Sequence, residues 1–153
     1  MGKILVGIVV VSHSNLLADE LIKLMQIFKQ EEFNIENGGN PSGEVYGTNK
    51  ETVIKAIKKA DSGNGVLVFV DMGSSIFYSL EAKEELKGSI KVEIADAPLV
   101  EGTISAVSAN FDDISLEELK EIAENFVIAL EDKDEETAKK IFEELREKWE
   151  ELE

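Results

Sequence analysis

Two stretches of the chain are apolar at nearly every position, and each is followed directly by polar residues. Residues 3–11 read KILVGIVVV, and residues 65–71 read GVLVFVD. Continuous runs of β-branched and other apolar residues are typical of strands buried on both faces of a parallel sheet. Residues 33–37 (FNIEN) predict a short strand, and the alternating residues 89–95 (SIKVEIA) predict a strand nearer a sheet edge.

Apolar residues at helical spacing follow these strands and predict helices over residues 15–30, about 50–60, 75–87 and 115–130. A shorter helix is expected within residues 98–110 (PLVEGTISAVSAN). Capping boxes are expected at Thr48 with Glu51 and at Ser115 with Glu118. The inner faces that the spacing predicts are Leu17, Leu21, Leu24, Met25 and Phe28, then Val53, Ile54 and Ile57, then Phe77, Leu80 and Leu86, then Leu116, Leu119, Ile122, Phe126 and Leu130.

Alternation of strands and helices predicts βαβ units. We therefore expect an α/β three-layer sandwich with a mainly parallel central sheet. In the strand order 2-1-3-4, the first and third strands are neighbours. Ligands of such sheets bind outside the carboxyl ends of the strands, where the strand order reverses. We therefore expect the binding or catalytic residues directly after the strands.

Polar motifs stand at three of these strand ends: SHSN at 12–15, DMGSS at 71–75 and DAPLVEGT at 96–103. The predicted strand order places His13 and Asp71 opposite each other. An aspartate that accepts a hydrogen bond from one imidazole nitrogen fixes the tautomer and leaves the other nitrogen free as nucleophile or base. His13 is also the only histidine of the chain.

Glycine and serine residues stand where the helices after the first and third strands begin. They suggest an anion site beside His13 and Asp71. The backbone N–H groups of Ser14, Gly73, Ser74 and Ser75 lie at predicted helix N-termini, which favour anions. A neutral imidazole, an orienting carboxylate and an anion pocket together suit acceptance of a phosphoryl group.

Each feature also has a purely structural interpretation. A lone histidine at a strand end is more often structural than catalytic, and Asp71 or Ser74 could cap a helix. The glycine-rich loop before Thr48 matches neither a P-loop nor a dinucleotide fingerprint. A Ser–His–acid hydrolase is disfavoured, because no G-x-S-x-G elbow is present. One histidine and no cysteine argue against a zinc site, and no metal or cofactor is expected.

Composition narrows the class of protein. The 153 residues suit one domain, the absence of cysteine removes disulfides, and no apolar run has the length of a membrane span. The apolar N-terminus lacks a signal-peptide cleavage site, so we expect a cytoplasmic protein. The net charge is −16, and 17 acidic residues against 6 basic ones lie after residue 111. Such acidity argues against nucleic-acid binding, and it either favours a basic protein partner or serves only solubility.

The motifs VVVSHS, VLVFVDMGSS and APLVEGT, in this order, resemble the phosphoryl-transfer subunits of bacterial phosphotransferase-system-dependent dihydroxyacetone kinases. Those subunits are similar to the IIA domains of mannose-family sugar transporters. The resemblance covers about residues 4–110. It implies that His13 accepts a phosphoryl group from the phosphocarrier protein HPr. The group would then pass to ADP on the nucleotide-binding subunit of the kinase, as part of a phosphoenolpyruvate–glycerone phosphotransferase.

The resemblance also implies roles for other residues. Asp71 would orient His13, and the walls of the phosphoryl pocket would be Ser14, Gly73, Ser74, Gly102, Thr103, Gly47 and Thr48. Relatives are dimers, so a homodimer is expected. Two alternatives remain open: a mannose-type IIA domain that feeds a sugar permease, and a non-catalytic module that senses phosphorylation state. The short DMGSS motif, without tryptophan, favours the kinase over the permease.

The C-terminal segment lies beyond the motifs. Some relatives continue into a carrier domain, whereas this chain stops, so it would need a separate carrier. We expect a phosphoryl-transfer domain over residues 1–130 and an acidic helical extension over residues 131–153. The extension has an apolar stripe at helical spacing, which predicts packing on its own domain or, alternatively, a dimer contact or linker remnant; it comprises Ala138, Ile141, Phe142, Leu145, Trp149 and Leu152.

Overall fold

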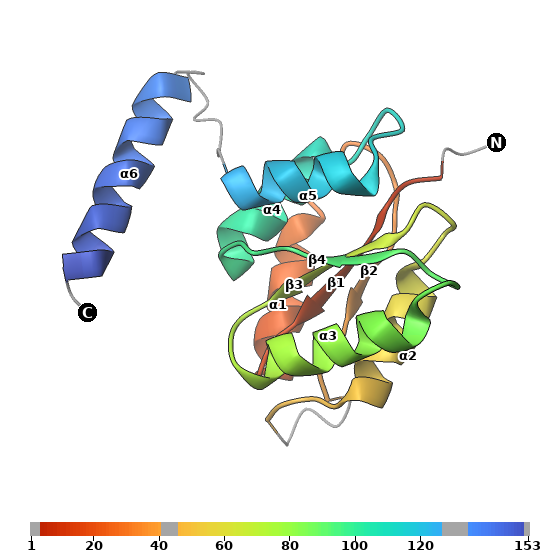
Figure 1. Ribbon diagram of the computed structural model, residues 1–153. Helices are drawn as coiled ribbons and strands as arrows, with labels where there is room; N and C mark the ends of the chain where they lie inside the picture. The colour runs from red at the N-terminus through yellow and green to blue at the C-terminus, as the bar shows by residue number, and fades with distance from the viewer. Residues whose placement is uncertain (1–3, 41–45, 127–134, 152–153) are drawn as a thin grey trace.

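The fold is a three-layer α/β sandwich, seen in a computed structural model that describes residues 4–40, 46–126 and 135–151 (Figure 1). Along the chain lie β1 (Gly7–Val11), α1 (Asn15–Met25), β2 (Ile35–Asn37), α2 (Lys50–Ala60), β3 (Val66–Val70), α3 (Ser74–Leu86), β4 (Val92–Ile94), α4 (Leu99–Ala109), α5 (Leu116–Asn125) and α6 (Glu135–Glu151). Each predicted strand is present, and the helix expected within residues 98–110 is α4.

The four strands form one parallel sheet in the order β2-β1-β3-β4, as the sequence predicts. β1 and β3 run side by side with Val11 opposite Val70, so the residues that follow both strands emerge at the same edge. β4 is a short edge strand, which agrees with its alternating sequence. The strand order therefore brings together the polar motifs that follow the first and third strands, SHSN and DMGSS.

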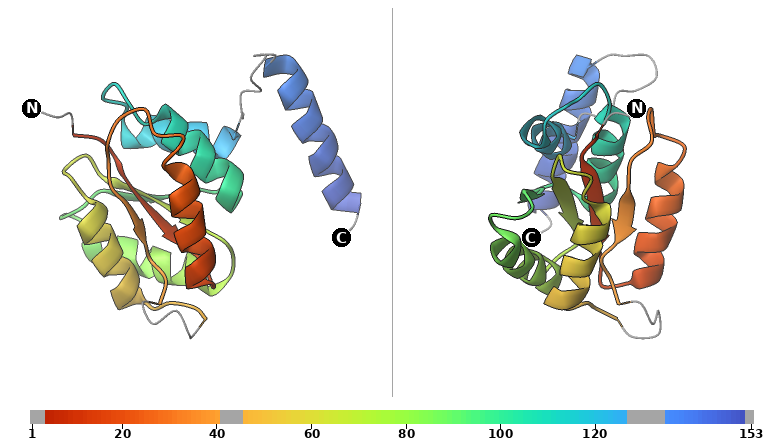
Figure 2. Two further views of the ribbon diagram at one scale, coloured as in Figure 1. Left: turned by 180° about the vertical axis from the view of Figure 1, so that it is seen from behind. Right: turned by 90° about the vertical axis from the view of Figure 1, so that its right-hand side faces the viewer.

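Helices cover both faces of the sheet and bury its side chains in two separate cores (Figure 2). Ile8 and Val10 of β1 face the core formed with α1, α4 and α5, whereas Val9 and Val11 face the core formed with α2 and α3. All five residues of β1 and of β3 are buried. Burial on both faces explains why these strands read as continuous apolar runs.

Gly7 allows α2 to pack closely on β1. A Cβ atom at this position would lie 2.2 Å from the carbonyl oxygen of Ala60, the last residue of α2. Any side chain here would push the helix away from the strand. The glycine that interrupts the apolar run of β1 is thus a packing requirement.

Several details of the helix predictions are wrong. α1 ends at Met25, because residues 26–28 form tighter turns in which each N–H donates to the carbonyl three residues earlier. The predicted inward residues that are exposed instead are Leu17 and Leu24 of α1, Phe77 and Leu80 of α3, and Ile122 of α5. The residues of α3 that face inward are Ser75, Ser79, Ala82 and Leu86, most of which are small and allow the helix to pack closely on the sheet.

The start of α2 also differs from the prediction. Asn49 caps this helix, because its side-chain oxygen accepts a hydrogen bond of 2.8 Å from the N–H of Thr52. Thr48 lies one residue too early, and its hydroxyl donates instead to the carbonyl of Gly38 at 2.6 Å. The second predicted capping box, between Ser115 and Glu118, is confirmed at the start of α5.

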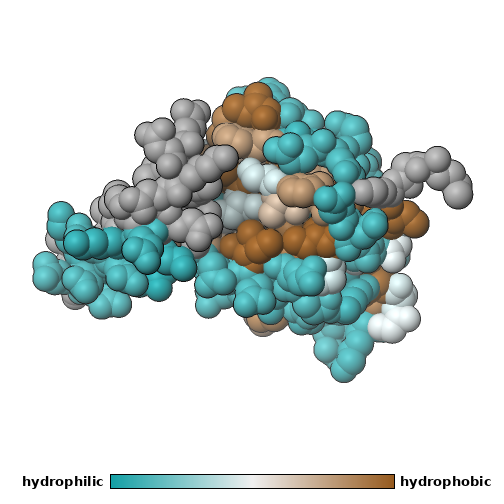
Figure 3. All heavy atoms as spheres, turned by 90° about the horizontal axis from the view of Figure 1, so that it is seen from above, coloured by the Kyte–Doolittle hydropathy of each residue, from teal (hydrophilic) through white to brown (hydrophobic). Residues whose placement is uncertain are grey.

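The predicted C-terminal helix is present as α6, and the guanidinium of Arg146 lies 5.4 Å from the ring centre of Phe126 at the end of α5. The side chains of the apolar stripe predicted for this segment lie outside the described residues, as does Leu130. Figure 3 looks down on the side of the molecule that carries α4 and α5. Apolar side chains gather there between hydrophilic ones, and Phe111 and Ile122 are among the exposed apolar residues.

Candidate functional site

His13 and Asp71 meet at the carboxyl edge of the sheet, two residues after β1 and one residue after β3. Nδ1 of His13 lies 3.1 Å from Oδ1 and 3.2 Å from Oδ2 of Asp71. The backbone N–H of His13 also donates to Oδ2 at 2.8 Å. The predicted apposition of these two residues is therefore confirmed. The imidazole stays accessible, since its side chain is 35% exposed.

The carboxyl of Asp71 is held in its ionised form. Burial alone would raise its pKa, but hydrogen bonds from the backbone of His13, the hydroxyl of Ser75 and the backbone of Met72 outweigh this effect. Together with the His13 side chain, they lower the pKa of Asp71 from 3.8 to about 2. At neutral pH the carboxylate can therefore only accept hydrogen bonds.

This charge state determines the tautomer of a neutral His13. Because the carboxylate of Asp71 only accepts, Nδ1 must carry the proton and donate it. Nε2 then keeps its lone pair, and the hydroxyl of Ser74 lies 3.1 Å from it. The Ser74 hydroxyl must be the donor in this contact. The nitrogen with nucleophilic character is thus the one that faces the start of α3.

The backbone of His13 is fixed on its other side by the loop that precedes α2. The N–H of Gly47 donates to the carbonyl of His13 at 2.7 Å. Thr48 holds this loop to the end of β2 through its hydrogen bond to Gly38. The structure therefore brings Gly47 to the backbone of His13, and Thr48 contributes through the loop rather than through the imidazole.

The start of α3 supplies backbone donors near Nε2. Gly73 has a φ of +52°, a conformation that side chains disfavour, and it turns the chain from Asp71 into the helix. Within the described residues, the N–H groups of Gly73 and Ser74 donate to no protein acceptor, whereas that of Ser75 donates to Met72. Gly73 and Ser74 therefore offer the donors that an anion beside His13 requires.

Ser14 differs from the expectation. Its hydroxyl caps α1 by accepting from the N–H of Leu17 at 3.2 Å. Its own N–H is not free, because it donates to the hydroxyl of Ser12 at 3.1 Å. Ser14 therefore shapes the start of α1, and its backbone amide is occupied.

Gly102 and Thr103 lie inside α4 and are buried. The nearest neighbours of a Cβ at Gly102 would be Ala97 and Phe69, and the hydroxyl of Thr103 donates to the carbonyl of Leu99. The absence of a side chain at Gly102 lets α4 pack closely on Phe69 of β3, and the hydroxyl of Thr103 is engaged within α4. Among the described residues, no hydrogen bond joins either of them to His13.

The site also contains Ser12, which the sequence did not single out, and the hydroxyl of Ser75, of which only the backbone N–H was predicted to contribute. Ser12 is fully buried, and its hydroxyl donates to Oδ2 of Asp71 at 3.1 Å. Ser75 is 1% exposed, and its hydroxyl lies 3.4 Å from Nδ1 of His13. A polar residue directly after a buried strand was the available signal for Ser12.

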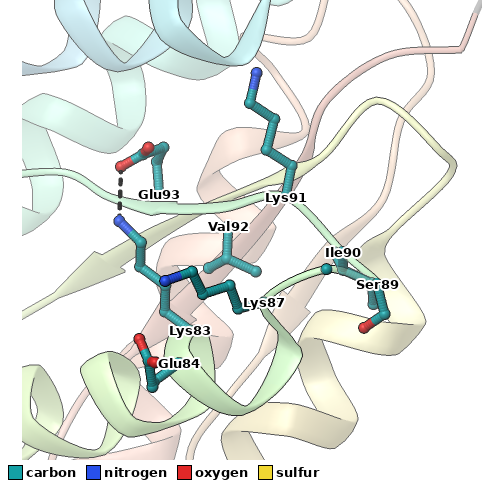
Figure 4. Close-up of a pocket in the computed structure, with 9 residues that line it drawn as sticks. Lys83, Glu84, Lys87, Ser89, Ile90, Lys91, Val92 and Glu93 are labelled. Atoms are coloured by element: carbon teal, nitrogen blue, oxygen red, sulfur yellow. Dashed lines mark hydrogen bonds and ion pairs between the residues drawn. The ribbon is translucent and has the colours of Figure 1, made fainter.

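A cavity and a cluster of lysine–glutamate contacts lie away from His13. A cavity of about 450 Å³ lies at the opposite edge of the sheet, between the end of α3 and β4 (Figure 4). Lys83 and Lys120 both donate to Glu93 there, at 3.1 and 3.4 Å, and so tie α3 and α5 to β4. Burial would raise the pKa of Glu93, but Lys83 above all lowers it.

The described residues hold neither a cluster of metal ligands nor a helix that could span a membrane. Within these parts of the chain, no group of three or more histidine, cysteine, aspartate or glutamate side chains is placed to hold a metal ion. No helix among them combines the length and the apolar character that crossing a membrane requires.

Comparison with known proteins gives one family match and several relatives. The model of a family described as "PTS system fructose IIA component" matches residues 7–124. The chain is 32% identical over 122 residues to the Lactococcus lactis "PTS-dependent dihydroxyacetone kinase, phosphotransferase subunit DhaM", covering 80% of this chain and 96% of the relative. A crystal structure of the unknown-function protein EF1359 has 29% identity and a TM-score of 0.67, and the match covers 77% of this chain and 92% of that one.

Longer relatives carry a similar name, "PEP-dependent dihydroxyacetone kinase, phosphoryl donor subunit DhaM". The Escherichia coli protein is 36% identical over 107 residues, which cover 67% of this chain and 23% of the relative. The Providencia stuartii protein is 29% identical over 120 residues, which cover 75% and 25%. The chain thus spans about a quarter of the length of these two relatives.

Proposed function

Since the chain belongs to the family of PTS system fructose IIA components, we propose that it relays a phosphoryl group through a phosphohistidine at His13. The main support for this proposal is that the two ring nitrogens of His13 have different partners. Nδ1 is engaged by Asp71, and Nε2 faces Ser74 and the start of α3. A positioned imidazole with one free nitrogen beside an anion pocket is what a phosphoryl acceptor needs.

The transfer step uses residues that lie within reach of one another. Nε2 of His13 attacks the phosphorus of a phosphohistidine on the carrier. The bond from phosphorus to the carrier's ring nitrogen breaks, and its electron pair stays on the carrier. Asp71 stabilises the positive charge that develops on the His13 ring by accepting the proton of Nδ1 in a hydrogen bond. The N–H groups of Gly73 and Ser74, with the Ser74 hydroxyl, offset the charge on the phosphoryl oxygens.

The names of the relatives support dihydroxyacetone kinase as the system served. In this proposal the donor is HPr, and the acceptor is ADP bound on the nucleotide-binding subunit of that kinase. Residues 1–130 carry the relay, residues 131–153 form the helical extension, and the chain works as a cytoplasmic homodimer. It is the phosphotransferase component, and it binds neither the sugar substrate nor free nucleotide.

An apolar rim beside His13 supports docking of a protein rather than a small molecule. We define it as the exposed side chains of Met72, Ile76, Phe77 and Leu80 around the start of α3, with Leu16 and Leu17 in the first turn of α1. Exposed apolar patches of this kind mark protein contacts. The acidity of the chain, net −16, favours a carrier that is basic where it docks.

The test is a two-stage transfer followed by intact mass. Phosphorylated HPr is expected to add one phosphoryl group to the native chain and none to His13→Ala, while Asp71→Asn gains it more slowly. Addition of the ADP-loaded kinase subunit should then remove the phosphoryl group from His13 and yield ATP. Labelling that persists in His13→Ala would refute the relay. Transfer of the phosphoryl group to a mannose-type sugar permease, but not to ADP, would support the sugar-transporter alternative that the family description suggests.

A further inference from the structure

The hydroxyl of Ser12 lies between the start of α1 and the carboxylate that orients His13. Ser12 is fully buried at the end of β1 and makes two hydrogen bonds. It donates to Oδ2 of Asp71 at 3.1 Å and accepts from the N–H of Ser14 at 3.1 Å. The residues before and after His13 are thereby linked to the same carboxylate as His13 itself.

The direction of this chain of hydrogen bonds is fixed at both ends. A backbone N–H can only donate, so Ser14 must give its proton to the oxygen of Ser12. An ionised carboxylate can only accept, so the hydroxyl proton of Ser12 must point to Asp71. The Ser12 hydroxyl therefore has no other arrangement open to it that satisfies both neighbours.

The same carboxylate oxygen also receives the N–H of His13 at 2.8 Å and lies 3.2 Å from Nδ1. The donors from Ser12 and the His13 backbone approach Oδ2, while the N–H of Met72 donates to Oδ1 at 2.7 Å. These bonds restrict rotation of the carboxylate. The orientation that they select is the one in which both oxygens face Nδ1.

We propose that Ser12 is a positioning residue that acts through Asp71: it holds the carboxylate where it receives the proton of Nδ1, and so keeps Nε2 of His13 unprotonated. The inference rests on the proposed function only for its consequence, since an unprotonated Nε2 is the nucleophile of the relay. The tautomer itself is a property of the unphosphorylated chain.

A structural role of Ser12 would have different consequences. If its hydroxyl only satisfied the buried N–H of Ser14, its loss would weaken the fold without altering the His13 ring. Ser79 provides a matched control, because it is also fully buried and its hydroxyl donates to the carbonyl of Ser75 at 2.7 Å. Its hydroxyl is thus engaged within α3 rather than by the Asp71 carboxylate.

The test is ¹⁵N nuclear magnetic resonance of the imidazole, which is unambiguous because the chain has one histidine. Spectra are recorded above the end of the measured titration of the ring, for the native chain, Ser12→Ala and Ser79→Ala. The native chain is expected to show the Nδ1–H tautomer. Ser12→Ala should raise the ratio of Nε2–H to Nδ1–H several-fold, up to about tenfold, which is the factor that one hydrogen bond to a charged group can supply. Ser79→Ala should leave the ratio unchanged.

An unchanged ratio in Ser12→Ala would overturn the proposal, and so would equal shifts in Ser12→Ala and Ser79→Ala. If Ser12→Ala does not fold, Ser12→Cys replaces it, because a thiol is a weak donor of similar size. The same rise in the ratio is expected there, and its absence would be equally decisive. The spectra need no phosphoryl donor, so failure of HPr to label His13 would refute the relay and leave this test intact.

Discussion

At the scale of single residues, the carboxylate of Asp71 links the parts of the site. It accepts from the side chain and backbone of His13, from the hydroxyl of Ser12 and from the backbone of Met72. The backbone of His13, the hydroxyl of Ser75, the backbone of Met72 and the His13 side chain together lower its pKa to about 2, although burial opposes this. The carboxylate therefore keeps its charge throughout the pH range in which a histidine titrates, and the direction of each hydrogen bond stays fixed.

The lowered pKa of Asp71 predicts a pH-dependent contribution to stability. Because the pKa is lower in the folded chain than the ordinary value of 3.8, the contribution is fully present above about pH 5 and is lost progressively as the pH falls through about 2. It amounts to about 2 kcal/mol. The difference in unfolding free energy between the native chain and Asp71→Asn should therefore shrink by about this amount between pH 6 and pH 2.

Urea unfolding followed by circular dichroism at several pH values measures this difference. Asp61→Asn is a suitable control, because the carboxylate of Asp61 accepts one hydrogen bond, from the N–H of Gly63 at 3.0 Å. We expect a much smaller change with pH for that pair. A native-minus-Asp71→Asn difference that stays constant down to pH 2 would contradict the assigned hydrogen bonds.

At the scale of elements, α3 has two roles. Its inward face is made of small residues such as Ser75, Ser79 and Ala82, which allow close packing on the sheet. Its outward face carries Phe77 and Leu80, which are 59% and 52% exposed. Helical periodicity gives the spacing of such residues, but the most apolar face is not the inward one here. The sequence therefore predicted the helix correctly and its orientation wrongly.

The exposed face of α3 predicts a docking defect. Phe77 lies one helical turn after Ser74, so a carrier that reaches Nε2 of His13 would contact it. Phe77→Glu should slow phosphoryl transfer from HPr about tenfold or more at low carrier concentration, as expected for a central apolar contact. Ile27→Glu is the control, since Ile27 is 74% exposed but follows the far end of α1. Equal transfer rates for the two variants would refute docking at the apolar rim.

At the scale of the whole molecule, continuous apolar runs alternating with helices predicted a parallel sheet, and the expected strand order 2-1-3-4 then predicted the meeting of His13 with Asp71. Register makes this possible, because Val11 and Val70 are paired and their successors emerge together. The sequence could not show that Gly102 and Thr103 lie inside α4, since a motif at a helix start reads the same whether it packs or binds. It also left Ser12 unassigned, because a serine beside a strand gives no sign of the hydrogen bonds it will make.

The family match divides the chain into a matched part and a C-terminal segment. The family match ends at residue 124, close to the end of α5 at Asn125, and α6 follows with its guanidinium contact to Phe126. In this account the chemistry requires the sheet edge, α3 and the loop at Gly47. The helical extension is outside that set.

The most direct test is to identify the phosphorylated atom. The chain is incubated with phosphorylated HPr, and the imidazole of its single histidine is observed by ¹⁵N and ³¹P nuclear magnetic resonance. We expect one phosphoryl group bonded to Nε2 of His13, with the proton on Nδ1. A phosphoryl group on Nδ1 would contradict this expectation. So would the absence of phosphohistidine on the chain while HPr keeps its own phosphoryl group.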